Sequence, residues 1–209
     1  MGDGERTSGS DAVDERKRST LRRFAALGAA GPLARLADDG DARDSDARDA
    51  IAGYLAATPG AHFSKVRDDL GLATGESQHH LRRLERTGAI ESRRDGDYRR
   101  FFPADAFDAF EQVALGHLRR ETARGMIIAL LRDPETAPSA LAARVGVSRP
   151  TVSKRAADLE RAGLLARADG YALVRPATLL TLLVRYADSF DEATRAFAAE
   201  ADDLIRVDP

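Results

Sequence analysis

The chain has 209 residues, a net charge of −2 at pH 7, 43% apolar residues and 6% aromatic residues. This balance is ordinary for a soluble protein, and the few aromatic residues favour small, close-packed helical cores. The sequence contains no cysteine, which excludes disulfides, zinc fingers and cysteine nucleophiles and fits a reducing compartment.

The first 47 residues show neither a secretory signal nor a membrane span. Residues 1–20 are rich in Asp, Glu, Ser, Gly and Arg without apolar periodicity, so we expect a disordered tail. Residues 21–47 are expected to form a short helical and loop segment, and its apolar stretch from Phe24 to Leu33 is too short to cross a bilayer. We therefore expect a cytoplasmic protein without membrane contact.

An internal repeat organises the rest of the chain. Residues Asp49 to Ile90 match Arg124 to Leu165 without gaps at an offset of 75 residues. Residues 48–103 carry a net charge of +2 and residues 117–176 a net charge of +5, with acidic segments on either side. Local basic blocks of this kind suit a nucleic-acid partner even when the total charge is near zero.

Both copies predict the same series of elements, three helices followed by a hairpin. Each third helix ends at a Gly, and each hairpin turns at Asp-Gly, the strongest short hairpin signal. This order is that of a winged helix-turn-helix domain, and we assign one to residues 48–103 and one to 121–176. The predicted helices are 51–57, 63–70 and 74–87 in the first copy and 126–131, 139–145 and 149–162 in the second; the predicted strands are 90–94 and 98–102, then 164–167 and 171–174.

The third helix of the second copy carries residues suited to DNA contact. Ser148 can cap the helix, while Val152, Ala156 and Leu159 point inward at helical spacing. The side chains that remain outward near its start can bond phosphates or base edges in a major groove. The predicted DNA-contact residues of this copy are Ser148, Arg149, Thr151, Ser153 and Lys154.

The segments VGVSRPTVSK (145–154) and DLERAGLL (158–165) resemble winged-helix transcriptional regulators of the MarR and ArsR type. The resemblance implies that the same Ser, Arg, Thr, Ser and Lys positions contact double-stranded DNA. The first copy, GLATGESQHHLRRLE (71–85), is similar, but Ala73 replaces the capping Ser and Ser77 replaces a core Val. Together the copies resemble predicted archaeal regulators with two winged helices. The candidate DNA contacts of the first helix are Thr74, Gln78, His79, Arg82 and Arg83.

The first wing is the more basic of the two. Arginines bracket Asp95-Gly96 and alternate with aromatic residues, which suits contact with the DNA backbone or a minor groove. We therefore assign the stronger wing contact to the first domain and the sharper recognition helix to the second. The candidate wing contacts are Arg93, Arg94, Arg99 and Arg100 in the first domain and Arg167 in the second.

Other interpretations were weighed against DNA binding. Winged helices also dock proteins, and Arg82, Arg83 and Arg86 could form a solvated face paired with Glu85 or Asp68. His79 and His80 do not form a convincing metal site, because adjacent helical residues point about 100° apart. No Gly-rich phosphate loop or HExxH-like segment is present, so we predict neither an enzyme nor a cofactor.

The segments around the second copy predict further helices. Residues 104–120 are expected to form an amphipathic connecting helix, and residues 177–209 two C-terminal helices. The C-terminal helices can pack on their own domain or, with the connecting helix, mediate a homodimer. The predicted fold is thus mainly α with small β-hairpin wings, in two tandem winged helix-turn-helix domains plus C-terminal helices.

Overall fold

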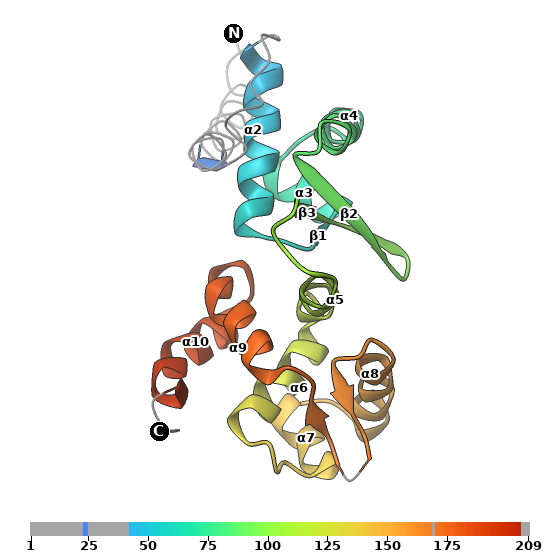
Figure 1. Ribbon diagram of the computed structural model, residues 1–209, viewed down its shortest axis with the longest axis vertical. Coiled ribbons are helices and arrows are strands. Elements are labelled where there is room, and N and C mark those ends of the chain that lie inside the picture. The colour runs from blue at the N-terminus through green and yellow to red at the C-terminus, as the bar shows by residue number, and fades with distance from the viewer. Residues whose placement is uncertain (1–22, 25–41, 169, 206–209) are drawn as a thin grey trace, which may run out of the picture. The chain divides into compact units, whose positions relative to one another are not determined.

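The computed structural model describes residues 23–24, 42–168 and 170–205, without the side chains of residues 42–45 and 202–205. The chain divides into two compact units, residues 1–106 and 107–209, and each is described by itself (Figure 1). The predicted tail at 1–20 lies outside the described residues, as does most of the segment 21–47. No helix in the part of the chain that the structure describes is long and apolar enough to cross a membrane.

Among the residues that the structure describes, the first unit contains the helices α2, α3 and α4 and a three-stranded antiparallel sheet in the order β1-β3-β2. Strand β3 lies in the middle, pairing Ala61 with Phe101 on one side and Arg93 with Arg100 on the other. The predicted hairpin is present, and β1 is an additional strand. The elements are α2 (Ala42–Ala57), β1 (Ala61–His62), α3 (Phe63–Leu70), α4 (Thr74–Arg86), β2 (Ile90–Asp95) and β3 (Tyr98–Pro103).

The core of this unit is built from the apolar side of each helix and from β3. Tyr54 of α2 is 2% exposed, and its hydroxyl donates to the Asp69 carboxylate at 2.8 Å. The Phe24 ring packs edge-on against the Tyr54 ring, with 5.2 Å between centroids. The hydrogen bond joins α2 to α3, and α2 also packs against α4. The core also contains Ile51, Leu55, Val66, Leu70, Leu81, Leu84, Ile90 and Phe101.

The second unit repeats the three helices and hairpin and adds helices at both ends (Figure 1). Helix α5 packs against α6 and α9 within this unit, so the segment predicted as a connecting helix is part of the second compact body. The elements are α5 (Ala109–Leu118), α6 (Glu121–Arg132), α7 (Pro138–Val145), α8 (Arg149–Arg161), β4 (Leu165–Ala166), β5 (Ala172–Leu173), α9 (Pro176–Arg185), a 3-10 turn (Ala187–Ser189) and α10 (Glu192–Ile205).

The two C-terminal helices pack on their own unit. Leu179 and Leu183 of α9 and Phe197 of α10 are fully buried. Arg124 of α6 donates to the Leu118 carbonyl at 2.8 Å and forms an ion pair with Asp191, just before α10. Burial alone would raise the pKa of Asp191, but hydrogen bonds from Thr194 and Arg124 lower it to about 2. Of the two predicted roles of these helices, packing on the domain is therefore observed.

Both third helices end at a glycine, as predicted. Gly88 and Gly163 each have a φ of +72°, a left-handed conformation that glycine adopts at low cost. The following residue, Ala89 or Leu164, donates its N–H back to the helix at 2.9 Å. The chain thus turns from each helix into its wing in the same way, and the predicted winged-helix architecture, mainly α with small hairpins, is confirmed in both units.

The second wing is shorter than predicted. Strands β4 and β5 have two residues each and pair Leu165 with Leu173 and Ala166 with Ala172. This hairpin has alanines at positions 166, 168 and 172 and no phenylalanine, whereas the first wing is rich in arginine and phenylalanine, so the second wing offers fewer cross-strand side-chain pairs. The longer wing of the first unit is consequently the larger basic surface.

Candidate nucleic-acid interface

The start of α8 is fixed by its cap. The Ser148 hydroxyl accepts the N–H of Thr151 at 3.3 Å, and the two hydroxyl oxygens lie 2.8 Å apart. Ser148 therefore caps the helix as predicted, and Thr151 is only partly exposed. These two residues define the first turn, and the exposed polar side chains beside them are Arg149, Ser153 and Lys154.

Positive charge on α8 is compensated only beyond its first two turns. Arg155 and Arg161 both form ion pairs with Asp158, at 3.0 and 3.1 Å. Arg149 and Lys154, by contrast, make no ion pair with any residue that the structure describes. The N-terminal half of the helix thus presents two exposed cations, where the helix dipole also favours an anion.

Helix α4 begins without a capping side chain, as Ala73 implied. The Glu76 carboxylate bonds in the reverse direction, accepting the N–H of the cap residue Ala73 at 3.1 Å. Ser77, at the position of a core Val, is fully buried, and its hydroxyl donates to the Ala73 carbonyl at 3.0 Å. The polar Ser77 is therefore satisfied within its own helix, and α4 starts at the position equivalent to the start of α8.

The exposed face of α4 contains most of the predicted contact residues. Thr74, Gln78, His79 and Arg82 are exposed, while Arg83 is half-buried. Of the three arginines weighed as a paired face, Arg82 and Arg86 form no ion pair with Glu85 or Asp68 among the described residues, and these two carboxylates bond Arg99 and Arg67.

Arg86 extends this face but is missing from the predicted site. It is exposed, and it follows Gln78 and Arg82 at successive four-residue steps, so all three lie along one stripe of the helix. The four-residue spacing in the sequence would have been enough to add Arg86 to the predicted DNA-contact residues.

The wing of the first unit carries its cations in three different environments. Arg93 and Arg94 on β2 are exposed, and the Arg94 Nε donates to the Gly96 carbonyl at 3.3 Å. Arg99 on β3 donates to the Glu85 carboxylate at 2.7 Å and to the Ser92 hydroxyl at 2.8 Å. All three side chains are accessible, and Arg99 in addition connects the wing to α4.

The prediction that Arg100 contacts DNA is wrong. Its side chain is buried, with the residue only 3% exposed, and it donates to the Gly60 carbonyl at 2.9 Å and forms an ion pair with Asp95. Side chains alternate along a strand, so Arg100 shares its side of β3 with the fully buried Phe102. Because the adjacent Phe101 and Phe102 are both buried, the sequence pattern alone did not show on which side of the strand Arg100 lies.

Arg167 also connects a wing to a third helix. It lies directly after β4, and its Nε donates to the Glu160 carboxylate of α8 at 2.7 Å. This bond raises the pKa of Arg167. Arg167 is exposed, but its charge is already matched by Glu160, which makes it a weaker DNA-contact candidate than Arg149 or Lys154.

The histidine pair does not resemble a metal site. His79 is exposed and His80 is 3% exposed, and their rings lie 5.4 Å apart at an angle of 79°. Across the described residues, no three His, Asp or Glu side chains gather in a way that would hold a metal ion.

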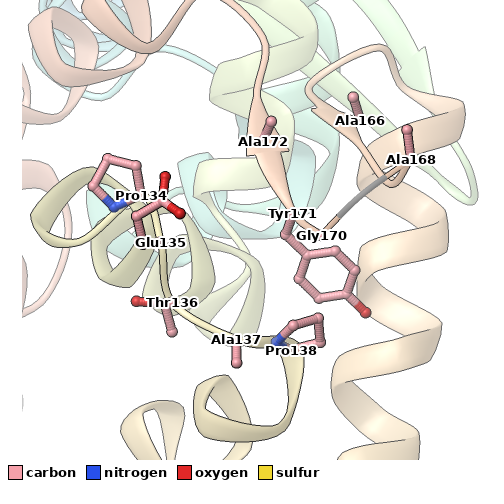
Figure 2. Close-up of a pocket in the computed structure, with 10 residues that line it drawn as sticks. All are labelled: Pro134, Glu135, Thr136, Ala137, Pro138, Ala166, Ala168, Gly170, Tyr171 and Ala172. Carbon is pink, nitrogen blue, oxygen red and sulfur yellow. The ribbon is translucent and has the colours of Figure 1, made fainter.

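A hollow of about 530 Å³ lies between the α6–α7 loop and the second wing (Figure 2). Among the described residues, its lining contains one charged side chain, Glu135, and the Tyr171 ring, and otherwise alanine, proline, glycine and one threonine. Ligand sites usually add several converging polar groups to an apolar wall, which this hollow does not offer.

Comparison with known proteins agrees with this arrangement. A family model described as an N-terminal HTH domain matches residues 45–115, and one described as a winged helix-turn-helix DNA-binding domain matches residues 119–166. The chain carries two helix-turn-helix domains in tandem. The first match covers the first unit from within α2 onward and extends into α5, while the second covers α6, α7, α8 and β4.

A curated relative is similar to 90 residues of this chain. It is an uncharacterized HTH-type transcriptional regulator of Methanocaldococcus jannaschii, 29% identical over 90 residues, which are 43% of this chain and 22% of that protein. The matched part is thus about a fifth of that relative's length. No solved structure matches the chain. These matches support a DNA-binding regulator with two HTH domains, whereas the finer MarR or ArsR resemblance stays a prediction.

Proposed function

We propose that this protein is a transcriptional regulator that binds double-stranded DNA in a sequence-specific way. In the proposal, the third helix of each HTH domain enters a major groove and the wing contacts the adjacent backbone or minor groove. The distribution of charge on α8 carries the proposal. Every cation of the helix beyond Lys154 has a carboxylate partner, whereas Arg149 and Lys154 have none in the described structure.

Each recognition helix offers groups that can bond base edges. Arg149 can donate two hydrogen bonds to a guanine, and Gln78 of α4 can bond an adenine through both its amide oxygen and nitrogen. Ser153 can donate to or accept from several bases, and Lys154 can reach guanine or phosphate. All four side chains are exposed, so no rearrangement of the core is needed for contact.

The wing of the first domain supplies charge to the phosphates. Arg93 and Arg94 are exposed on β2, while Arg99 is bonded to α4. We assign Arg93 and Arg94 to backbone or minor-groove contact, and Arg99 and Arg167 chiefly to holding the wings in place. Backbone contacts add affinity without sequence preference, so specificity is assigned to the helices.

Selection of bound sequences from random duplex DNA, followed by binding titrations at two salt concentrations, tests the proposal. The wild type is compared with Arg149→Ala/Lys154→Ala. A control variant, Arg185→Ala/Arg195→Ala, removes the same charge from exposed positions of α9 and α10. We expect an enriched motif, an affinity loss of tenfold or more in the α8 variant and little change in the control, because each good base contact contributes about 1–3 kcal/mol.

The alternative function is a protein-docking scaffold that uses the winged helices without reading DNA. An absence of enriched sequences at both salt concentrations would favour it, and so would equal binding by the α8 variant and the control. DNA binding requires no catalytic step or cofactor, and we propose neither. We further propose that the protein acts in the cytoplasm of an archaeal cell, as the source of its relative suggests.

A further inference from the structure

We propose that the two HTH domains read different base sequences, so that one chain recognises an asymmetric, two-part duplex site. This inference rests on the proposed function and deepens it. It makes the DNA target neither a palindrome nor a direct repeat, because the two recognition helices present different chemistry at matching positions.

The positions match because α4 and α8 have the same local structure. Both helices have 13 residues, each starts one residue after an extended cap residue, and each leads to a glycine with a φ of +72°. The first helical residues, Thr74 and Arg149, are separated by the 75 residues of the repeat. A residue of α4 can therefore be compared directly with the residue of α8 that lies 75 positions later.

The buried sides of the two helices agree, as a shared scaffold requires. Leu84 and Leu159 are identical and buried, and Leu81 and Ala156 are both apolar and buried. The pair Ser77 and Val152 differs in polarity, but both side chains are buried and Ser77 is bonded to its own helix. The packing of each third helix in its domain is thus conserved between the copies.

The exposed sides differ at nearly every position that faces away from the core. The first helical residue is Thr74 in α4 and Arg149 in α8, so one helix offers a hydroxyl where the other offers a guanidinium. Of the five pairs compared here, only Arg86 and Arg161 are identical, and Arg161 forms an ion pair with Asp158. The other corresponding residues are Gln78 with Ser153, His79 with Lys154, Arg82 with Ala157 and Arg86 with Arg161.

These differences change which bases each helix can bond. Arg149 and Lys154 only donate hydrogen bonds, which suits the acceptor atoms O6 and N7 of guanine. Gln78 both donates and accepts, which suits the edge of adenine, and Thr74 can do either. The half of the site read by α8 is therefore expected to favour guanine at one or more positions, and the half read by α4 to favour adenine.

Two different HTH domains in one chain differ from a dimeric regulator that has one DNA-binding domain in each chain. A symmetric dimer presents the same helix twice, and its operator mirrors that symmetry as a palindrome. Here the two DNA-binding domains belong to one chain, and their recognition helices differ in chemistry. A single chain can therefore mark the direction of its site on the duplex, which a symmetric dimer cannot.

The test is a specificity swap in the full-length chain. Thr74→Arg/Gln78→Ser/His79→Lys gives three exposed positions of α4 the residues of α8. Thr181→Arg/Ala199→Lys adds the same two formal charges at exposed positions of α9 and α10 as a control. Motifs are selected from random duplex DNA with the wild type, the swap, the control and Arg149→Ala/Lys154→Ala.

We expect two dissimilar half-sites for the wild type and the control. The swap should shift the half read by α4 toward the other half, with at least a tenfold change in relative preference for adenine there. The Arg149→Ala/Lys154→Ala variant should weaken the other half alone. Two identical half-sites, or a motif that ignores the α4 residues, would overturn the inference while leaving the proposed function intact. No enriched motif with the wild type would overturn both.

Discussion

The guanidinium of Arg99 on β3 donates to the carboxylate of Glu85 on α4, at 2.7 Å, so an ion pair joins the first wing to its recognition helix. The second domain contains the matching pair, Glu160 of α8 with Arg167 beside β4. The glutamates are 75 residues apart and equivalent, but the arginines come from opposite strands of the two hairpins. The same connection is thus made from two different positions on the wing.

For this ion pair, the positioning role of Arg99 and the net charge predict opposite changes in DNA affinity. Glu85→Gln removes a negative charge close to the proposed DNA surface, which by charge alone would strengthen binding. If Arg99 holds the wing in place, the loss of the ion pair should instead weaken binding by about two- to fivefold, an energy of the size usual for exposed pairs. A binding titration of the full-length chain at fixed salt measures the difference.

Asp97→Asn is the matched control for that variant. Asp97 is exposed in the turn of the same wing and makes no ion pair or hydrogen bond with any described side chain. Its neutralisation should therefore slightly strengthen DNA binding. If both variants strengthen binding to the same degree, Arg99 does not position the wing.

Much of this fold could be predicted from the repeat and from the residues that end its helices and form its turns. The glycines at 88 and 163, the Asp-Gly turns and the helical spacing of apolar residues gave the order of the elements, because these signals are local. The two-residue strand β1 escaped prediction, since its pairing with Phe101 depends on a contact 40 residues away. The placement of α5 in the second unit likewise depends on packing against α9, which no local pattern reveals.

The site was predicted less completely than the fold. The exposed residues at the start of α8 follow from helical periodicity, and the structure places Arg149, Ser153 and Lys154 as expected. Arg100 was misassigned because a run of basic residues says nothing about which side of a strand each one occupies. The sequence also does not show which cations form ion pairs, so Arg99 and Arg167 could not be distinguished from Arg149 and Lys154.

Arg100 should contribute to stability rather than to DNA binding. Its buried guanidinium joins Gly60 to Asp95, and removing it leaves both acceptors without that donor. We expect Arg100→Ala to lower the free energy of unfolding by about 3 kcal/mol, as for other broken buried ion pairs. Its cross-strand neighbour Arg93 is exposed, so Arg93→Ala should change stability by no more than about 0.5 kcal/mol. Urea denaturation of both variants measures this, and equal values would contradict the assignment.

His62 should make the stability of the first domain depend on pH. Its Nδ1 accepts the Lys65 N–H at 3.3 Å as the cap of α3. Burial lowers the pKa of His62 below 6.5, and the charges of Arg100 and Lys65 lower it further, against a smaller opposing effect of Asp68 and Asp69.

The lowered pKa fixes the sign of this effect. The unfolded chain takes up a proton at His62 more readily than the folded one, so stability is lost as the pH falls below 6.5. His62→Asn keeps a capping residue without the titration. We expect the wild type to lose more stability than His62→Asn between pH 7 and pH 5, measured by denaturation at each pH. Parallel curves for the two proteins would show that His62 is not responsible.

Arg93 and Arg94 should contribute to affinity without contributing to sequence preference. They are exposed on the wing, where contact with phosphates releases counterions, and each such contact contributes about 0.9 to the slope of log affinity against log salt. Arg93→Ala/Arg94→Ala should therefore reduce the slope by about 1 to 2 and weaken selected and unselected duplexes to a similar degree. Arg149→Ala/Lys154→Ala should instead weaken the selected duplex more, because direct base contacts are lost with it. An altered base preference in the wing variant would place Arg93 or Arg94 on base edges in the minor groove rather than on the backbone.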